Sequence, residues 1–345
     1  MFKKFFSKIN KGLGIDLGST KTMIYQQDRG IVVNESSVVA VNMRTDQILA
    51  VGGEARKMLG KTPPHIIANK PLEYGIISDF EITEKMIRYF IGRLYAGKLA
   101  FSARPRVVVG IPLDVTEVEK KAVEDVILSA GASQVFLVEN IVAAAIGARI
   151  PIQDPSGNMI VNLGGGLTEV AVISLDGIVN WKVSKVAGLA LDRDIIKFAR
   201  DEFNLVLGEM VAEEIKRKIG SAVNLDENLQ MEMRGREIVS GLPREVLVDD
   251  SQIRSALAKS VRHILEVIKS TLETTPPELV ADIYQKGVIL TGGTALLKGI
   301  DRFISKNIGI PVHIADDPQT CAVRGMGIVL DDETLLNDIA IPSSQ

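Results

Sequence analysis

Residues 13–24 read LGIDLGSTKTMI, and residues 159–170 read MIVNLGGGLTEV. Each stretch has a strand-like apolar run, a turn of small residues and a second strand-like run, which is the pattern of a β-hairpin. A shift of 146 positions aligns four pairs of residues: Asp16 with Asn162, Leu17 with Leu163, Gly18 with Gly164 and Thr22 with Thr168. Two similar hairpins half a chain apart predict two related α/β domains that face each other.

Strand-like and helix-like segments alternate along the rest of the chain, which predicts an α/β fold with mostly buried sheets. The expected strands are 31–41, 48–51, 107–112, 135–138, 159–164, 170–175, 178–184 and 286–293. The expected helices are 83–97, 114–130, 141–149, 190–220 and 252–272. Either Asp114 or Thr116 can cap the second of these helices. Residues 221–250 are polar with short strand-like pieces, and the last dozen residues are expected to be poorly ordered.

The composition is that of a globular protein. The chain has 345 residues, 46% of them apolar, and a net charge of −3, which suits roughly two domains. It has no run of 18 apolar residues that would form a transmembrane helix. The near-neutral charge argues against nucleic acid as a partner. Cys321 is the only cysteine, so no disulfide forms within the chain, and the three histidines have no metal-ligand spacing.

The first eleven residues, MFKKFFSKINK, form a basic and aromatic stub. Phe2, Phe5, Phe6 and Ile9 recur with the spacing of one helix face, and four lysines lie among them. A short helix of this kind suits the surface of an anionic bilayer. A frayed tail and a helix docked on the domain are the alternatives.

The glycine turns of the two hairpins can bind phosphate. Glycine lets backbone N–H groups approach a phosphate closely, and Ser19, Thr20 and Thr168 add hydroxyls while Lys21 adds a positive charge. Asp16, at the end of the strand, is placed to hold Mg²⁺ through water. A third glycine turn, TGGTA at 291–295, also follows a strand. The three turns together predict a nucleotide site.

Several longer segments carry a resemblance to a known family. They include GIDLGSTKT (14–22), VVVGIPLDVTEVEKKAV (107–123), VFLVENIVAAAIGA (135–148), NLGGGLTEVAVISL (162–175), AEEIKRKIGSA (212–222) and GVILTGGTALLKGID (287–301). On these, the chain resembles the actin/Hsp70/sugar-kinase superfamily and, within it, the MreB-type bacterial actins over essentially its whole length. The resemblance implies an actin-like ATPase fold of two related α/β domains, each with a subdomain, around a nucleotide cleft.

The resemblance also implies domain boundaries. Residues 1–11 are the membrane-binding stub. Domain I is 12–142, with subdomain IB at about 32–75, and is completed by 320–340. Domain II is 143–319, with subdomain IIB at about 183–245.

The resemblance further implies a site for ATP or GTP with Mg²⁺, and assigns its residues turn by turn. The first phosphate hairpin is Gly18, Ser19, Thr20 and Lys21, with Asp16 near the metal. The second is Gly164, Gly165, Gly166 and Leu167. The adenosine segment is Glu213, Glu214, Ile215 and Lys216, and the turn beside the base is Gly292, Gly293, Thr294 and Ala295. A surface ion pair is the alternative for Glu213 and Lys216.

The sequence departs from the family pattern at the catalytic positions. Asn140 stands where the family has the glutamate that positions the attacking water, and Leu167 replaces a threonine. Asn162 replaces an aspartate, and Ala187-Gly188-Leu189 replaces Gly-Gly-Asp. An amide orients water but cannot accept its proton, so slow or absent hydrolysis is expected. Compensation by Glu139 or Glu169 is the alternative, although the Glu139 side chain should point away from Asn140.

For function, the resemblance implies a cytoplasmic protein at the inner face of the cell membrane that forms filaments and helps to determine cell shape. Leu99 and Phe101 match the family's membrane loop, with ordinary loop packing as the alternative. The implied partners are further copies of the chain, which could pair as protofilaments, the anionic inner membrane surface, membrane proteins of the cell-wall elongation machinery, and sister paralogues. A small-molecule kinase of the same superfamily fold is the alternative function.

Overall fold

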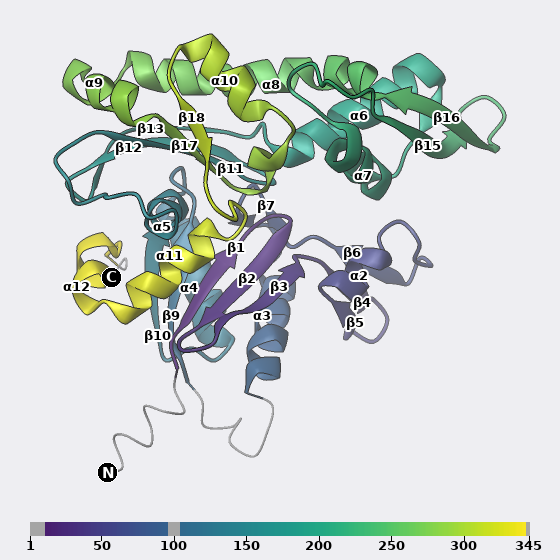
Figure 1. The fold of residues 1–345 in the computed structure, drawn as a ribbon. Coiled ribbons are helices and arrows are strands. Elements are labelled where there is room, and N and C mark those ends of the chain that lie inside the picture. Colours follow the sequence, from purple (N-terminus) through teal and green to yellow (C-terminus); the bar gives the residue numbers. More distant parts are fainter. Residues whose placement is uncertain (1–10, 96–103, 343–345) are drawn as a thin grey trace. The chain divides into compact units, whose positions relative to one another are not determined.

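The computed structural model describes residues 11–95 and 104–342, which form two compact α/β units (Figure 1). The first unit comprises residues 1–153 and 319–345, and the second comprises residues 154–318. The first of these units ends at Gln153, while the resemblance implied a domain boundary after residue 142. The α/β class expected from the sequence is confirmed in both units.

The first unit is built on a five-stranded sheet of order β10-β9-β1-β2-β3. Its strands are β1 (Leu13–Leu17), β2 (Lys21–Gln26), β3 (Gly30–Ser36), β9 (Arg106–Ile111) and β10 (Gln134–Glu139). β1 and β2 form the predicted antiparallel hairpin, while β9 runs parallel to both β1 and β10. Buried aliphatic side chains on nearly every residue of β9 suit a sheet covered on both faces.

Five helices belong to this sheet: α3 (Phe80–Leu94), α4 (Glu117–Ser129), α5 (Asn140–Gly147), α11 (Cys321–Asp331) and α12 (Glu333–Ile339). Thr116, one of the two expected caps, begins α4 through a capping box with Glu119. The helix α12 shows that the expected disorder of the last dozen residues is wrong as far as residue 342. Asp332 caps α12, and Ile341 N donates to Leu137 O of the edge strand β10 at 2.9 Å.

A smaller part of the first unit lies between β3 and α3. It has a three-stranded sheet of order β5-β4-β6 and a two-stranded one, β7-β8. Its elements are β4 (Val39–Asn42), β5 (Gln47–Val51), α2 (Gly53–Lys57), β6 (Ile66–Asn69), β7 (Leu72–Glu73) and β8 (Ile76–Ile77). The expected strand 31–41 is therefore two strands, because the chain passes from one sheet to another after Ser36.

Helices α5 and α11 pack backbone to backbone. A Cβ atom on Gly147 would lie 1.9 Å from Cys321 O, and one on Gly325 would lie 1.7 Å from Ala143 O. Both distances are far below van der Waals contact, so only glycine fits at either position. This contact joins the C-terminal segment to the first unit, and it explains why α5 belongs to that unit rather than to the next.

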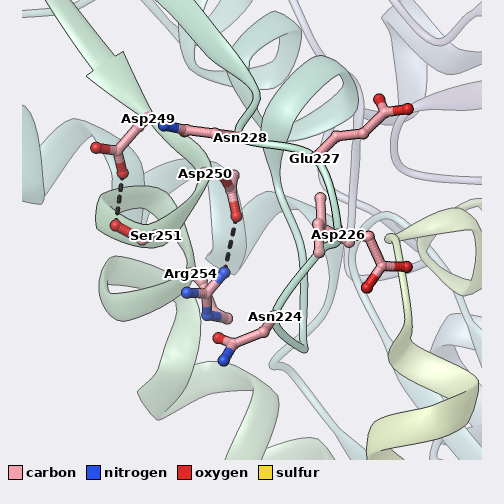
Figure 2. Close-up of a pocket in the computed structure, with 9 residues that line it drawn as sticks. Asn224, Asp226, Glu227, Asn228, Asp249, Asp250, Ser251 and Arg254 are labelled. Carbon is pink, nitrogen blue, oxygen red and sulfur yellow. Dashed lines mark hydrogen bonds and ion pairs between the residues drawn. The ribbon is translucent and has the colours of Figure 1, made fainter.

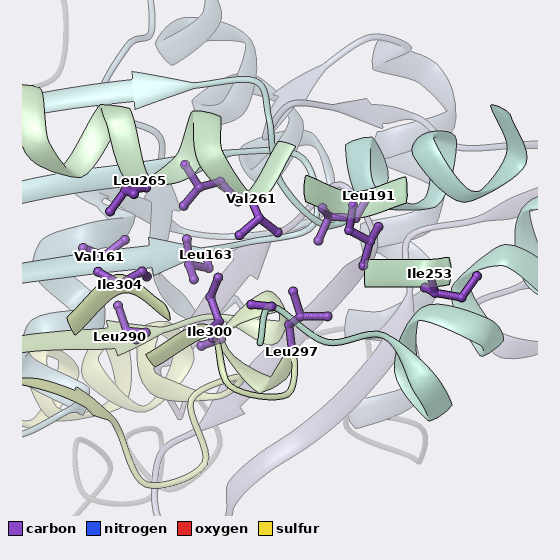
Figure 3. Packing of buried hydrophobic residues seen from close by; sticks show 14 of the residues in the cluster. Val161, Leu163, Leu191, Ile253, Val261, Leu265, Leu290, Leu297, Ile300 and Ile304 are labelled. Atoms are coloured by element: carbon purple, nitrogen blue, oxygen red, sulfur yellow. The ribbon is translucent and has the colours of Figure 1, made fainter. Parts of the chain in front are cut away.

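The second unit is built on a sheet of order β13-β12-β11-β17-β18. Its strands are β11 (Asn158–Leu163), β12 (Thr168–Ser174), β13 (Gly177–Ser184), β17 (Val288–Thr291) and β18 (Val312–Ile314). β11 and β12 form the second predicted hairpin, and β17 runs parallel to β11. One large apolar core joins this sheet to the helices, with Val161, Leu163 and Leu290 packing among residues of α8 and α10 (Figure 3).

The remaining elements of the second unit are α6 (Gly188–Phe203), β14 (Leu205–Val206), α7 (Glu209–Ile219), β15 (Gln230–Glu237), β16 (Pro243–Asp249), α8 (Asp250–Glu273), α9 (Pro277–Lys286), η2 (Gly293–Leu296) and α10 (Ile300–Ile308). The expected helix 190–220 is two helices, because Asn204 takes a left-handed conformation with φ of 53° and ends α6. The strand-like pieces of 221–250 are β15 and β16, which form a sheet with β14.

Within the described residues, no helix combines the length and the apolar character that crossing a bilayer requires.

The contact between α5 and α11 predicts that Gly325→Ala destabilises the protein by about 3 kcal/mol, because the new methyl group meets a backbone carbonyl that cannot turn away. Thermal or urea unfolding measures this change. Gly92→Ala is the matched control, since Gly92 lies in α3 with nothing within 4 Å of the added Cβ. The control should stabilise by about 0.5 kcal/mol through helix propensity. Equal stability of the two variants would contradict the close helix contact.

Candidate functional site

The first glycine turn, Gly18 to Lys21, joins β1 to β2 and is closed by its own backbone. Gly18 N donates to Lys21 O at 3.0 Å, and a Cβ on Gly18 would lie 2.7 Å from that oxygen. The turn is also held from outside, because Ser37 Oγ donates to Gly18 O at 2.6 Å and Gly75 N donates to Ser19 Oγ at 2.7 Å. The Ser19 hydroxyl, expected as a phosphate donor, is thus buried and already accepts one hydrogen bond.

The other two predicted side chains of this turn differ in their surroundings. Thr20 is exposed, so its hydroxyl is open to a ligand. Lys21 Nζ donates to Gln319 Oε1 at 3.3 Å. Gln319 is the residue at which the chain returns to the first unit, and nothing in the sequence pattern pointed to it.

Asp16 and Asn140 lie on one face of the first sheet. Asp16 is the register partner of Gly110, and Gly110 is the register partner of Val138. A Cβ on Gly110 would lie 1.9 Å from Asn140 Oδ1 and 2.3 Å from the Met326 methyl carbon. The Asn140 amide therefore lies directly over Gly110, on the face from which Asp16 projects.

The Asn140 amide oxygen is buried and needs a donor. The residue is only 9% exposed, and Oδ1 has no hydrogen-bond partner among the described residues. A buried carbonyl oxygen without a partner costs about 1–3 kcal/mol. A water molecule or a ligand group that donates to it would remove that cost.

Glu139 lies on the other face of the sheet. Its neighbour in the strand, Val138, shares a face with Asp16, and successive side chains of a strand alternate. The Glu139 carboxyl is close enough to Lys120 of α4 to feel its charge, while burial raises the pKa of the carboxyl above its usual value. A raised pKa suits a proton acceptor, but this carboxyl lies on the wrong side of the sheet to replace a glutamate at Asn140.

The second glycine turn has the geometry of the first. Gly164 N donates to Leu167 O at 2.9 Å, and a Cβ on Gly164 would lie 2.9 Å from the same oxygen. The third turn adjoins it, because Thr294 Oγ1 donates to Gly164 O at 2.7 Å. Gly292, with φ of 84°, begins the third turn in a conformation that favours glycine.

Asn162 and Glu169 are bonded to each other at the base of the second hairpin. Asn162 Nδ2 donates to Glu169 Oε2 at 3.1 Å, and Thr291 Oγ1 donates to Asn162 Oδ1 at 3.4 Å. Glu169 is only 2% exposed. The Asn162 amide thus donates to the Glu169 carboxylate and accepts from the Thr291 hydroxyl.

The adenosine segment expected on α7 divides its side chains between core and surface. Ile215 is fully buried in the apolar core, and Glu214 is exposed and paired with Lys218 at 2.6 Å. Lys216 Nζ lies 2.7 Å from Asp192 Oδ1 of α6 and donates to Gly188 O at 2.8 Å. Lys216 thus forms a largely buried ion pair with Asp192, whereas the alternative given from the sequence was a surface ion pair for Glu213 and Lys216. Sequence reasoning missed Asp192.

In the described part of the chain, no group of three or more His, Cys, Asp or Glu residues is arranged to hold a metal ion by itself. The predicted membrane residues Phe2, Phe5, Phe6, Ile9, Leu99 and Phe101 lie outside the described residues.

A pocket of about 360 Å³ in the second unit contains none of the predicted residues. It lies at the start of α8, where loop residues 224–228 approach Asp249, Asp250 and Arg254 (Figure 2). Arg254 Nη1 pairs with Asp250 Oδ2 at 2.8 Å, which neutralises one of the carboxylates that line the pocket. We assign no ligand to this pocket.

Comparison with known proteins identifies the family. The sequence profile of the MreB/Mbl protein family matches residues 10–338. The chain is 43% identical over 322 residues to the cell shape-determining protein Mbl of Bacillus subtilis (strain 168), covering 93% of this chain and 96% of that protein. It is 42% identical over 335 residues to the cell shape-determining protein MreB of Escherichia coli (strain K12), covering 96% of both.

Solved structures agree with the sequence relatives. The crystal structure of MreB5 of Spiroplasma citri bound to ADP has a TM-score of 0.90 and 35% identity, and covers 96% of this chain and 98% of that one. The same protein bound to AMPPNP has a TM-score of 0.89. The MamK double helical filament, at 20% identity over 94% of this chain and 99% of that one, has a TM-score of 0.79 and shows the fold alone. The fold is therefore the actin-like one, and the chain belongs to the MreB/Mbl family.

Proposed function

We propose that this chain is a nucleotide-binding bacterial actin homologue that polymerises into membrane-associated filaments and helps to determine cell shape. The observation that carries the proposal is the pair of matching glycine turns, each closed by one backbone hydrogen bond of 2.9–3.0 Å. The family supports it, because relatives with more than 40% identity are cell shape-determining proteins. They are not small-molecule kinases, so the alternative function has no support.

Each turn offers polar groups to a polyphosphate. In the first unit, the exposed Thr20 and the ammonium of Lys21 suit phosphate oxygens, and Asp16 would hold Mg²⁺ through water. In the second unit, Gly165 and Gly166 have no Cβ atoms to keep a phosphate from their backbone, and Glu213 of α7 is the residue proposed to contact the nucleoside. The MreB5 structures with ADP and AMPPNP support a nucleotide in the related protein. ATP and GTP both remain candidate nucleotides.

We also propose that hydrolysis in this chain is slow. A bound water can donate a hydrogen bond to Asn140 Oδ1, which otherwise has no partner among the described residues. The amide then orients the water but cannot take its proton, and loss of a general base lowers a rate by about 10²–10⁴-fold. The proposal assigns this base to neither alternative, because the Glu139 carboxyl lies on the opposite face of the sheet from Asn140 and the Glu169 carboxylate accepts from Asn162.

Restoring the missing groups should therefore raise hydrolysis. Phosphate release from ATP is expected to be at least about tenfold faster in Asn140→Glu with Leu167→Thr than in the wild type. Asn140→Asp is the control, because its carboxylate is one methylene shorter and stays closer to Gly110. A wild-type rate equal to that of an MreB with the intact glutamate would contradict the proposal.

Polymerisation follows from the head-to-tail contacts of the family, since a heterologous contact that does not close builds a filament. Electron microscopy with nucleotide and Mg²⁺ on anionic lipid tests it. Filaments are expected for the wild type, and Gly18→Val is expected to abolish them because its side chain would meet Lys21 O and open the first turn. Wild-type protein that stays monomeric under these conditions would refute the assembly.

Membrane attachment is supported by the positions of the described residues next to segments 1–10 and 96–103, which contain the predicted membrane residues. Tyr95 Oη donates to Lys11 O at 3.1 Å. Leu13 and Val107, which follow the two segments, are register partners in β1 and β9. Lys11 and Tyr95, the described residues that border 1–10 and 96–103, thus lie at the same end of the first unit.

Sedimentation with liposomes that contain anionic lipid tests this attachment. Removal of residues 1–10 and the pair Leu99→Ala/Phe101→Ala should each weaken binding, and the combination should abolish it, because both segments start from one end of the unit. Val118→Ala, at an exposed apolar residue of α4, is the control and should bind normally. Unchanged binding of the combined variant would contradict the proposal.

Pull-down from membranes tests the elongation-machinery proteins and sister paralogues as further partners.

A further inference from the structure

A buried ion pair in the second unit joins helix α6 to helix α7. The side chains of Lys216 and Asp192 are 14% and 8% exposed, and Lys216 Nζ lies 2.7 Å from Asp192 Oδ1. The same ammonium donates to Gly188 O at 2.8 Å. Two charges in such surroundings are stable only as a pair, because each alone would carry a large desolvation cost. The Lys216 ammonium is therefore held against the first turn of α6.

The first turn of α6 is in turn bonded to the second glycine turn. Gly188 N donates to Gly164 O at 3.2 Å, and Leu189 N donates to Gly165 O at 2.8 Å. Ala187, the N-cap, supplies no side-chain acceptor, so these carbonyls do the work of a cap. Gly188 must be glycine here, since a Cβ would lie 2.8 Å from Thr294 Oγ1 and 3.3 Å from Gly164 O.

These contacts form one continuous path from helix to turn. It runs from Asp192 to Lys216, from Lys216 to Gly188 O, and from Gly188 N to Gly164 O. Gly188 O and Leu189 N–H belong to the same peptide unit, which accepts from Lys216 at one end and donates to Gly165 O at the other. A shift of Lys216 therefore moves a peptide unit that supports the glycine turn.

We propose that Asp192 is a positioning residue of the nucleotide site, which acts through Lys216 and Gly188 on the backbone of the second glycine turn. The inference rests on the proposed nucleotide binding. It gives Lys216 a role that does not require contact with adenosine, because two of the three donors of its ammonium bind Asp192 and Gly188.

A positioning role for Asp192 predicts different effects on the binding of ligands with different numbers of phosphates. AMP lacks the β- and γ-phosphates that a glycine turn would bind, whereas ATP has them. Loosening the turn should therefore weaken the binding of ATP and leave the binding of AMP almost unaffected. If Lys216 instead touched adenosine, its loss would weaken both ligands alike.

The test is calorimetric titration of ATP and AMP into the full chain and its variants. Asp192→Ala and Lys216→Met should each weaken ATP binding about tenfold, the lower end of the effect known for loss of the outer hydrogen-bond partner of a metal ligand. The affinity for AMP should change by less than about twofold. The double variant should be no worse than either single one, since both remove the same path. Asp192→Asn should keep most of the ATP affinity, because its amide oxygen still accepts from Lys216.

Two controls separate positioning from general stability. Asp201→Asn changes an exposed acid of the same helix and should alter neither affinity. Amide hydrogen exchange of Gly188 and Leu189 in the nucleotide-free protein should speed up in Asp192→Ala, while exchange in β11 stays unchanged.

Each contrary outcome has a defined meaning. Equal weakening of ATP and AMP, additive effects of the two substitutions, or unchanged ATP binding in Asp192→Ala would overturn the inference alone. Wild-type protein that binds neither nucleotide would overturn the proposed function itself.

Discussion

The first unit depends on the contact between α5 and α11, where two helix backbones meet with no side chain between them. Gly147 and Gly325 make this approach possible. α11 also lies on the first hairpin, because the bare backbone of Gly14 meets Met326 and that of Gly327 meets the Tyr25 ring. The helix that starts at Asn140 and the turn that starts at Gly18 are thus fixed to the same C-terminal helix, and the geometry of the candidate site in this unit follows from that.

In the second unit, hydrogen bonds hold the glycine turn in place. Its glycine turn is supported by the first peptide units of α6 and by a threonine hydroxyl of the third turn. The two turns share the same closing hydrogen bond, which is the structural form of the sequence repeat. Their supports differ, since Ser37 and Gly75 hold the first turn. A duplicated hairpin has therefore kept its backbone while its surroundings diverged.

The sequence predicted what is local. The hairpins, the glycine turns and the cap at Thr116 each follow from a few neighbouring residues whose backbone preferences leave little choice. It did not predict contacts between distant segments, such as Gly147 with Cys321 or Asp192 with Lys216, because no single segment carries their signal. The boundary after Gln153 has no local signal for the same reason, since only the packing of α5 on α11 decides it. The break at Asn204 was readable in principle, as asparagine is common in the left-handed conformation that ends a helix.

One contact at the end of the chain bears on how such a protein avoids the wrong assembly. β10 is the edge strand of the first sheet, and unpaired edge strands invite other chains to add to them. Ile341 pairs with Leu137 of that edge strand through an isolated antiparallel β-bridge. The chain's own tail thus covers part of the place where two sheets could join edge to edge. This bridge hinders extension of the first sheet at β10 by a strand of another chain.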